Sequence, residues 1–347
     1  PVLAMMEEKG ILLDKDFFDA FSKELQQQLE LLEDKIYDHV GERFNINSPQ
    51  QLSDVLFKRL GLEPPDRSRR TSSGKLSTAA GVLEAMHGQH PIIGEILDYR
   101  ELTKLKSTYV DALPQQINPK TGRVHTSFNQ TGTVTGRIAS QDPNLQNIPT
   151  RTELGNRVRQ GFIAAPGHKL LSVDYSQIEL RIVAHISQDE AMIEAFRKGQ
   201  DIHATTAAAI YRVPLDQVDK RQRRHAKAIN FGLIYGMTPY GLTLSTDLTL
   251  AEAENFVKAY FETFPKVRQW LDQTKQLAAK QGYVETLLGR RRYFPNLQKG
   301  TNNALRQREE REAINAPIQG TAADIIKLAM IQLPLAFKQA NLHGDML

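Results

Sequence analysis

Cysteine is absent from the 347-residue sequence. This absence excludes disulfide bonds and zinc sites built on thiolates, and it fits a reducing compartment. Long apolar runs are absent as well, and none approaches the ~20 residues of a membrane-spanning helix. The N-terminus, Pro-Val-Leu-Ala-Met-Met-Glu-Glu, has no basic signal-peptide segment and no initiator methionine. We therefore expect no membrane partner, and we interpret the chain as an excised or processed piece.

A large excess of one charge sign is also missing. Lysine and arginine total 44 against 40 aspartate and glutamate, which gives a net charge of +4 and a pI near 9.1. This mildly basic balance permits a polyanionic partner without identifying one. Hydrophobic residues make up 40% and charged residues 24%, as in soluble globular proteins. The length suits two or three lobes better than one small core.

The first third of the chain has the apolar spacing of helices. Apolar residues recur every three or four positions over 15–40, which predicts one long amphipathic helix. Ser48 before Pro49 is typical of a helix start and predicts a second helix there. Residues 92–113 are also expected to be helical, with an end near Pro114.

Residues 63–77 have a different composition, PPDRSRRTSSGKLS over most of their length, which is polar, basic and rich in Pro, Ser and Gly. The segment is typical of a solvated flexible loop. It could equally be a mobile tip that touches phosphates. The basic side chains available for that contact are Arg67, Arg69, Arg70 and Lys75.

Short strands and turns are predicted over 116–150, with a turn at 118–122 and a strand at 124–128. A further strand is predicted over 170–175, and several helices follow it. There is no internal repeat. Helices, then strands, then helices favour an α+β architecture over a βαβ array.

The segment LLSVDYSQIELR at 170–181 carries the strongest chemical signal. A strand there would hold the Asp174 carboxylate rigidly at its end, which is a common position for a metal ligand. The helix that follows would bury Ile178, Ile182, Val183 and Ile186. For an isolated aspartate, the simpler interpretation is that Asp174 or Ser176 caps this helix. Spacing alone leaves both interpretations open.

Residues 221–235 read RQRRHAKAINFGLIY and place Arg223, Lys227, Phe231 and Tyr235 four apart. On a helix these residues form a slowly drifting stripe roughly 18 Å long. The stripe changes from two cations to two aromatic rings, an order that suits phosphates at one end and a sugar and base at the other. A plain amphipathic helix could give the same pattern.

Two further segments carry polar, non-acidic side chains suited to a nucleic-acid groove. One is TGRIASQDPNLQNIP at 135–149, and the other is REAINAPIQGTAADI, in which Arg311, Asn315 and Gln319 recur at a spacing of four. Such donors can test the acceptors that every correct base pair presents in the minor groove. For any one of these residues taken alone, the simpler interpretation is an ordinary polar group on the surface. Pro317 predicts a kink or a new first turn in the second segment. Basic residues compatible with backbone phosphates are Lys104, Lys106, Arg290, Arg291 and Arg292.

The string DYSQIELR resembles motif A of family A DNA polymerases, the DNA polymerase I type, at every position. The resemblance implies that Asp174 is catalytic and binds two Mg²⁺ ions with help from the Tyr175 carbonyl. It also implies that Gln177 and Glu179 contact the incoming nucleotide, with Glu179 under the sugar, where it leaves no room for a 2′-hydroxyl. Two such ions can clamp the attacking and leaving oxygens of a phosphoryl transfer.

The second string resembles motif B of the same family, R-x-x-x-K-x-x-x-F-G-x-x-Y-G. The resemblance implies that Arg223 and Lys227 hold the triphosphate, with Lys227 also catalytic. Phe231 would pack on the sugar, and Tyr235 would lie beside the nascent pair and complete the sugar gate. His203, in the similar string DIHATTA, would contact the phosphates as well.

The duplex-contact strings also resemble the family and imply a primer–template partner. The residues that would contact it are Arg137, Asn144, Gln146, Arg311, Asn315 and Gln319. Deoxynucleoside triphosphates would be the second partner. We further expect a monomer in a bacterial-type cytoplasm.

The resemblance covers essentially the whole chain and implies a right-hand α+β fold with a helical thumb, an antiparallel-sheet palm and helical fingers. We expect the thumb, with the start of the palm, over 1–115, the first palm part over 116–190, the fingers over 191–282 and a return to the palm over 283–347. The family's motif C, a His-Asp-Glu string, does not occur. We therefore expect a chain truncated before motif C, with an incomplete palm, and we do not assign Asp345 as a metal ligand.

Two main functions follow from these observations. The first is template-directed DNA synthesis by phosphoryl transfer to a primer 3′-hydroxyl. The second is non-catalytic binding of primer–template and nucleotide by an incomplete site. A single-subunit RNA polymerase is a weaker third, because a sugar gate at Glu179 would serve no purpose there.

Overall fold

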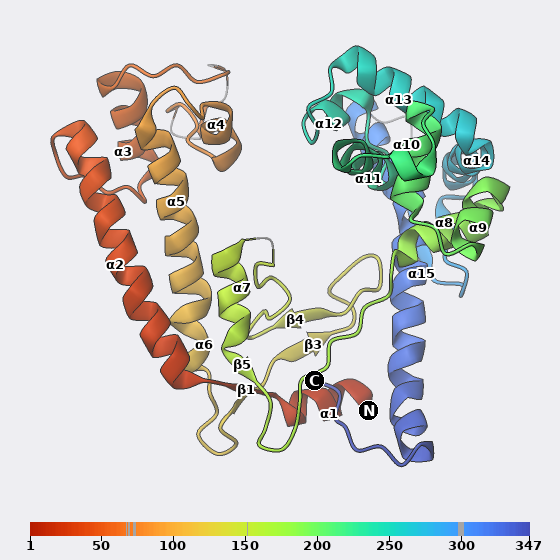
Figure 1. Ribbon diagram of the computed structural model, residues 1–347, viewed down its shortest axis with the longest axis horizontal. Coiled ribbons are helices and arrows are strands. Elements are labelled where there is room, and N and C mark those ends of the chain that lie inside the picture. Colours follow the sequence, from red (N-terminus) through yellow and green to blue (C-terminus); the bar gives the residue numbers. More distant parts are fainter. Residues whose placement is uncertain (67, 69, 72–73, 151, 298–301) are drawn as a thin grey trace.

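The computed structural model describes residues 1–347 except 67, 69, 72–73, 151 and 298–301. Two arms rise from a shared base, and the chain crosses from the first arm to the second through the base (Figure 1). Each arm has its own hydrophobic core. Buried residues between Leu13 and Val158 form the first core, and buried residues between Leu180 and Ala322 form the second.

The first arm is built on two long helices, α2 (Lys15–Val40) and α5 (Pro91–Leu105). The Asp14 carboxylate caps α2 by accepting a hydrogen bond from the Phe17 amide at 2.9 Å, and Gly41 ends the helix in the left-handed conformation. The shorter elements of this arm are α3 (Pro49–Ser53), η1 (Asp54–Arg59), α4 (Ala80–Ala85), η2 (Lys106–Val110), α6 (Ala112–Gln115) and α7 (Glu153–Gln160).

The base consists of small antiparallel sheets. Strand β1 (Ile11–Leu13) lies between β2 (Arg123–Val124) and β5 (Phe162–Ile163), while β3 (Ser127–Asn129) pairs with β4 (Ala139–Gln141). Helix α1 (Val2–Lys9) lies at the base near the C-terminus, as Figure 1 shows. The Lys9 ammonium contacts the Asp345 carboxylate at 2.6 Å, so the two ends of the chain meet there.

The second arm is helical. Its elements are α8 (Ile178–Ser187), α9 (Glu190–Arg197), α10 (Ile202–Tyr211), η3 (Leu215–Gln217), α11 (Lys220–Ile234), α12 (Pro239–Thr243), α13 (Leu250–Thr263), α14 (Pro265–Gln281), β6 (Tyr283–Glu285), β7 (Arg291–Tyr293) and α15 (Asn303–Gln339). Strands β6 and β7 form an antiparallel hairpin. Helix α15 packs against α8, α14 and β6 and then runs down toward the base (Figure 1).

Most of the predicted helices and turns are confirmed. Helix α2 has the predicted bounds, Ser48 caps α3, and the turn at 118–122 closes with the Gly122 amide bonded to the Asn118 carbonyl at 2.8 Å. The strand predicted at 124–128 is split between β2 and β3. The helix predicted over 92–113 is interrupted by the π-helical turn η2, and Pro114 lies inside α6.

The strand predicted over 170–175 is wrong. The segment is irregular and exposed, and Leu171 and Val173 are 84% and 83% exposed. A strand needs a neighbour to pair its backbone groups, and no described strand lies beside this segment. Within the described residues, the apolar segment therefore has no strand to pair with.

Helix α15 continues through Pro317, where a kink or a new turn was predicted. Pro317 is buried and removes one backbone hydrogen bond of the helix, while α15 as a whole packs against α8, α14 and β6. Within the described ranges, α15 is the one helix long and apolar enough to cross a membrane by length and composition. One such helix is weak evidence for a membrane span, because the core helices of soluble proteins have the same length and composition.

Candidate functional site

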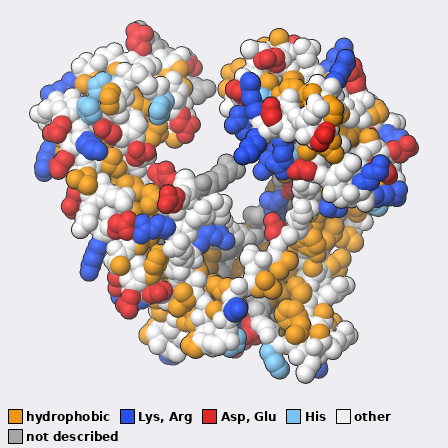
Figure 2. Space-filling view, in the orientation of Figure 1, with side chains coloured by type: hydrophobic (Ala, Val, Ile, Leu, Met, Phe, Trp, Pro, Cys, Tyr) orange, Lys and Arg blue, Asp and Glu red, His pale blue; other side chains and the backbone are white. Residues whose placement is uncertain are grey.

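Helix α11 carries the predicted stripe on the side of its arm that faces the hollow between the arms. A capping box on Asp219 and Gln222 starts the helix, so Arg223 falls in the first turns and Tyr235 at the C-cap. The exposed basic side chains of α11 beyond its first residue are Arg221, Arg223, Arg224 and Lys227. Figure 2 shows Lys and Arg side chains gathered along this border of the hollow. The basic half of the stripe is therefore exposed to solvent, whereas Phe231 and Tyr235 pack partly against the core of the arm.

The two cations of the stripe have different surroundings. Arg223 donates from Nε to the Asp201 carboxylate at 2.8 Å, and its Nη2 lies 2.7 Å from the same oxygen. The Asp201 carboxyl is partly buried, which alone would raise its pKa, but hydrogen bonds from Arg223 and two backbone amides lower the pKa overall. Lys227 has no ion-pair partner within the part of the chain that the structure describes. Among the described residues, Lys227 is thus the cation of the stripe that no carboxylate neutralises.

His203 lies behind the cations, on α10. Its ring is buried, and Nδ1 lies 3.0 Å from the Asn230 side-chain nitrogen, while Asn230 also bonds to Thr206. Burial lowers the pKa of His203 to about 4, with further contributions from the charges of Arg223 and Lys227. The ring centroid is 5.6 Å from that of Phe231. The fold therefore brings the predicted His203 together with the stripe.

Glu179 lies at a junction of three segments. The residue is 8% exposed, and it accepts hydrogen bonds from Arg137 Nη2 at 2.6 Å and from the Tyr235 hydroxyl. Burial and the Glu179 carboxylate raise the pKa of Tyr235 to about 12, whereas a hydrogen bond with Gln319 opposes this shift. The structure thus joins Arg137, Glu179, Tyr235 and Gln319, which the sequence places in four separate strings.

Asp174, Tyr175 and Gln177 belong to the irregular segment before α8. Neither Asp174 nor Ser176 caps α8, because the N-cap is Gln177, in the left-handed conformation and without a side-chain cap. The helix-cap interpretation of Asp174 is therefore wrong. The Asp174 carboxylate is exposed and has no partner among the described residues. It is free to bind a cation.

The donors at this segment fit only part of a magnesium site. A carboxylate and a backbone carbonyl are hard oxygen ligands of the kind that Mg²⁺ takes together with substrate phosphates. However, the described residues contain no group of three or more His, Cys, Asp or Glu side chains that could hold a metal ion. The described donor set does not complete a site for two ions.

Helix α15 carries the predicted Arg311, Asn315 and Gln319. Gly236, just after the stripe, has φ +70°, and a side chain there would come within 2.6 Å of the Arg311 side chain. The Asn315 side-chain oxygen is buried and lacks a hydrogen-bond partner in the described structure. The C-terminal end of α11 therefore packs closely on this part of α15.

Asn144 and Gln146 lie in the base near β4. Gln146 accepts from the Ser140 amide at 3.1 Å and donates to the Ile138 carbonyl at 2.8 Å, so its amide group already holds the loop together. Asn144 borders a pocket of about 460 Å³ with Tyr109 and Asn147. These two side chains lie in the base, whereas the α11 stripe lies on the second arm.

Several basic residues predicted as possible phosphate contacts are neutralised by carboxylates. Arg70 donates to the Gly74 carbonyl, and Arg67 and Arg69 lie outside the described residues. The ion pairs are Lys75 with Asp54, Lys106 with Asp111, Arg290 with Asp324, Arg291 with Glu285 and Arg292 with Glu312. The sequence alone predicts neither these pairings nor the ion pair between Arg223 and Asp201.

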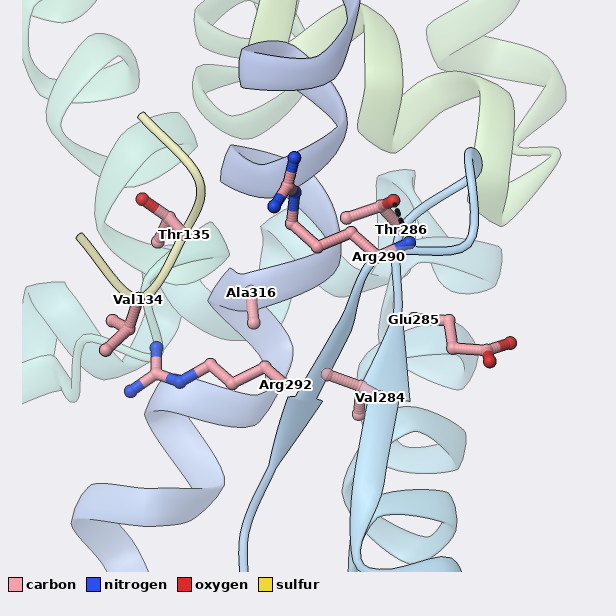
Figure 3. A pocket seen from close by; sticks show the side chains of 8 residues that line it. All are labelled: Val134, Thr135, Val284, Glu285, Thr286, Arg290, Arg292 and Ala316. Atoms are coloured by element: carbon pink, nitrogen blue, oxygen red, sulfur yellow. Dashed lines mark hydrogen bonds between the residues drawn. The ribbon is translucent and has the colours of Figure 1, made fainter. Parts of the chain in front are cut away.

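Arg290 and Arg292 line a small pocket of about 10 Å³. Val134 and Thr135 lie across it from the β6–β7 hairpin, and Ala316 of α15 lies between them (Figure 3). Gly136 follows these residues with φ +82°, and a side chain at this position would lie 2.6 Å from the Arg290 guanidinium. The glycine therefore lets the segment that carries Arg137 approach the hairpin closely.

The profile of DNA polymerase family A matches residues 15–347. The chain is 50% identical over 342 residues to the thermostable DNA polymerase I of Thermus filiformis, covering 99% of this chain and 41% of the relative. It is 51% identical over 332 residues to the enzyme of Thermus aquaticus, covering 96% and 40%. It is 48% identical over 347 residues to DNA polymerase I of Chloroflexus aurantiacus, covering 100% and 37%. The chain thus spans about two fifths of these relatives.

Among solved structures, the chain is similar to the POL domain of Pol1 from M. smegmatis in complex with DNA primer-template and dNTP. The TM-score is 0.89 at 41% identity, covering 99% of this chain and 60% of that chain. The fold is therefore the α+β right-hand fold of DNA polymerases. Within that class, the chain belongs to DNA polymerase family A, which confirms the resemblance seen in the sequence. Members of this family generally use divalent metal ions.

Proposed function

We propose that this chain carries out template-directed DNA synthesis, in which a primer 3′-hydroxyl attacks a deoxynucleoside triphosphate and pyrophosphate leaves. The observation that carries the proposal is the stripe on α11. Arg223 and Lys227 lie toward the start of the stripe, and Phe231 and Tyr235 follow. The buried His203 of α10 lies beside Phe231. The M. smegmatis relative, described with primer-template and dNTP, supports this assignment.

In this proposal, the cations bind the triphosphate and the aromatic residues bind the sugar and base. Arg223 supplies a forked donor and Lys227 a compact charge that can follow the phosphates through the reaction. Glu179 lies beneath the sugar, held by Arg137 and Tyr235. A carboxylate held on both sides cannot move away readily, so it would exclude a 2′-hydroxyl.

We further propose that Asp174 and the Tyr175 carbonyl contribute oxygen ligands to Mg²⁺, which supplies charge stabilisation at the reacting phosphate when bound. Gln177 would contact the nucleotide from the same segment. Both Asp174 and Tyr175 are exposed and lie directly before α8, whose first turn carries Glu179.

The partner of the remaining polar residues would be the primer–template duplex. Those residues are Arg137, Asn144, Gln146, Arg311, Asn315 and Gln319. We propose the thumb over 1–115, the palm over 116–190 and 283–347 and the fingers over 191–282. We further propose a monomer in a bacterial-type cytoplasm, since the relatives are DNA polymerases I of bacteria.

A second candidate is binding of primer–template and nucleotide without extension. The observation that favours it is the single carboxylate, Asp174, at the proposed metal segment, since no larger acidic or histidine cluster occurs in the described ranges. The two candidates differ only in whether the bound primer is extended.

One experiment separates them. A fluorescent hairpin primer–template is titrated with the chain, and the complex is then given complementary or non-complementary dNTP with Mg²⁺. Both candidates predict binding that complementary dNTP stabilises more than non-complementary dNTP. Primer extension above a Lys227→Ala control supports synthesis, whereas stable ternary binding without extension supports the second candidate. Absence of duplex and nucleotide binding would overturn both.

A further inference from the structure

The Asp201 carboxylate is surrounded by donors that proteins usually offer to phosphate. Oδ1 accepts from the backbone amides of His203 at 2.9 Å and Ala204 at 3.2 Å, at the start of α10. Oδ2 accepts from Nε of Arg223 at 2.8 Å, with Nη2 at 2.7 Å. Helix N-terminal amides and a guanidinium fork are both common phosphate-binding groups. Asp201 therefore occupies a place suited to an anionic oxygen.

Only one partner of this ion pair is fixed in position. Asp201 is held by its capping bonds to α10, whose Ile202, His203 and Thr206 are buried in the second arm. Arg223 is a long side chain that is 45% exposed. The pair can therefore open by movement of Arg223 alone. Because both side chains are partly exposed to water, Arg223 by 45% and Asp201 by 39%, the pair is weak enough for a multiply charged ligand to replace it.

The neighbouring cation, Lys227, is not held by a carboxylate within the described structure. Lys227 lies one helical turn further along α11 and has no ion-pair partner among the described residues. Burial keeps His203 neutral near pH 7. Without nucleotide, one of the two cations of the stripe is thus neutralised by a carboxylate, and the other is available.

We propose that Asp201 is an internal competitor that occupies Arg223 until an incoming polyphosphate displaces it. The proposal rests on the proposed function of the same site and adds a residue that sets its affinity. Arg223 is released only to a ligand that carries enough negative charge to replace the carboxylate. Asp201 therefore weakens nucleotide binding and makes Arg223 selective for polyphosphates over single phosphates.

The test uses Asp201→Asn, which removes the charge while an asparagine oxygen can still cap α10. The matched control is Asp219→Asn. Asp219 also caps a helix, lies one turn before Arg223, and forms no ion pair within the described structure. Isothermal titration calorimetry measures binding of complementary dNTP to each chain bound to a hairpin primer–template.

We expect D201N to bind dNTP about two- to fivefold more tightly than wild type, the range for loss of one exposed ion pair. We expect D219N to change the Kd by less than about 1.5-fold. Equal or weaker dNTP binding by D201N would overturn the competitor role. Absence of dNTP binding by the wild-type chain would instead contradict the proposed function.

A second measurement examines the ion pair without nucleotide. Phenylglyoxal modifies free guanidinium groups, and peptide mass spectrometry gives its rate at Arg223. The rate should rise in D201N and stay unchanged in D219N, and added dNTP should protect Arg223 in both. An unchanged rate at Arg223 in D201N would overturn the proposal even if the nucleotide site is correct.

Discussion

The hydroxyl of Tyr235 donates a hydrogen bond to the carboxylate of Glu179, 56 positions away in the sequence. Tyr235 ends the stripe helix α11, and Glu179 lies in the first turn of α8. Arg137 holds the other carboxylate oxygen. The proposed sugar gate is therefore a network of three side chains that the fold brings together.

The first prediction concerns the stability of this network. Tyr235→Phe removes one donor from a buried carboxylate and should lower the free energy of unfolding by about 1.5–3 kcal/mol, the cost of a hydrogen bond to a charged group. Tyr240→Phe is the control, because Tyr240 is 64% exposed and should change stability by no more than about 0.5 kcal/mol. Urea denaturation followed by circular dichroism measures both. Equal stability of the two variants would mean that the Tyr235–Glu179 bond contributes nothing.

The second prediction concerns sugar selectivity. Glu179→Ala opens space below the sugar and should reduce the preference for dNTP over rNTP by at least about tenfold, a typical value for relieving a steric conflict in a pocket. Competition binding of matched dNTP and rNTP to the chain and a hairpin primer–template measures it. The control is Glu101→Ala, an exposed residue of α5. If E179A keeps the wild-type preference for dNTP over rNTP, Glu179 does not exclude the 2′-hydroxyl.

The third prediction concerns pH. The pKa of His203 is lowered to about 4 in the fold, from about 6.5 in an unfolded chain. The fold therefore favours the neutral ring, and this stabilisation is complete above pH 6.5 and is lost as the pH falls toward 4, by up to about 3 kcal/mol. His203→Gln should flatten the dependence of unfolding free energy on pH in this window. His87→Gln, at an exposed site, should leave it as in wild type, and a wild-type slope in H203Q would refute the assignment.

The fourth prediction concerns Asp174. Because its carboxylate is exposed and unpaired in the described structure, Asp174→Asn should change stability by no more than about 0.5 kcal/mol and leave duplex binding nearly intact. It should weaken Mn²⁺ binding to the ternary complex, measured by electron paramagnetic resonance, by about tenfold or more. Exposed Asp38 of α2 provides the control Asp38→Asn. Unaltered Mn²⁺ binding in D174N would exclude Asp174 as a ligand.

Local patterns predicted several helices, among them α2 and the helix that carries the stripe. Helix α2 and the start of α11 depend on apolar period and capping residues, which the sequence displays directly. The strand at 170–175 could not be judged in the same way, because a strand is completed by a neighbour that may lie anywhere in the chain or outside it. Its apolar residues indicated a strand, yet the described structure has no partner for them.

The sequence also could not predict which cations are paired with carboxylates in the folded chain. Arg290, Arg291 and Arg292 read as a basic cluster, but each has a carboxylate partner, and Asp324 lies 34 positions from Arg290. The same holds for Arg223 and Asp201, 22 positions apart. Only tertiary packing decides which cations stay without a carboxylate partner and so remain available for phosphates. Among the described residues, Lys227 is one of these cations.

The most direct test of the account is therefore the affinity for complementary dNTP of the Lys227→Ala chain bound to a primer–template hairpin. Loss of one charge-assisted phosphate contact should cost about 1.5–3 kcal/mol, which is roughly a 10- to 100-fold weaker Kd. Lys220→Ala, an exposed residue at the start of the same helix, should bind as wild type does. Unchanged affinity in K227A, or an equal loss in K220A, would contradict the assignment of the α11 stripe as the nucleotide site.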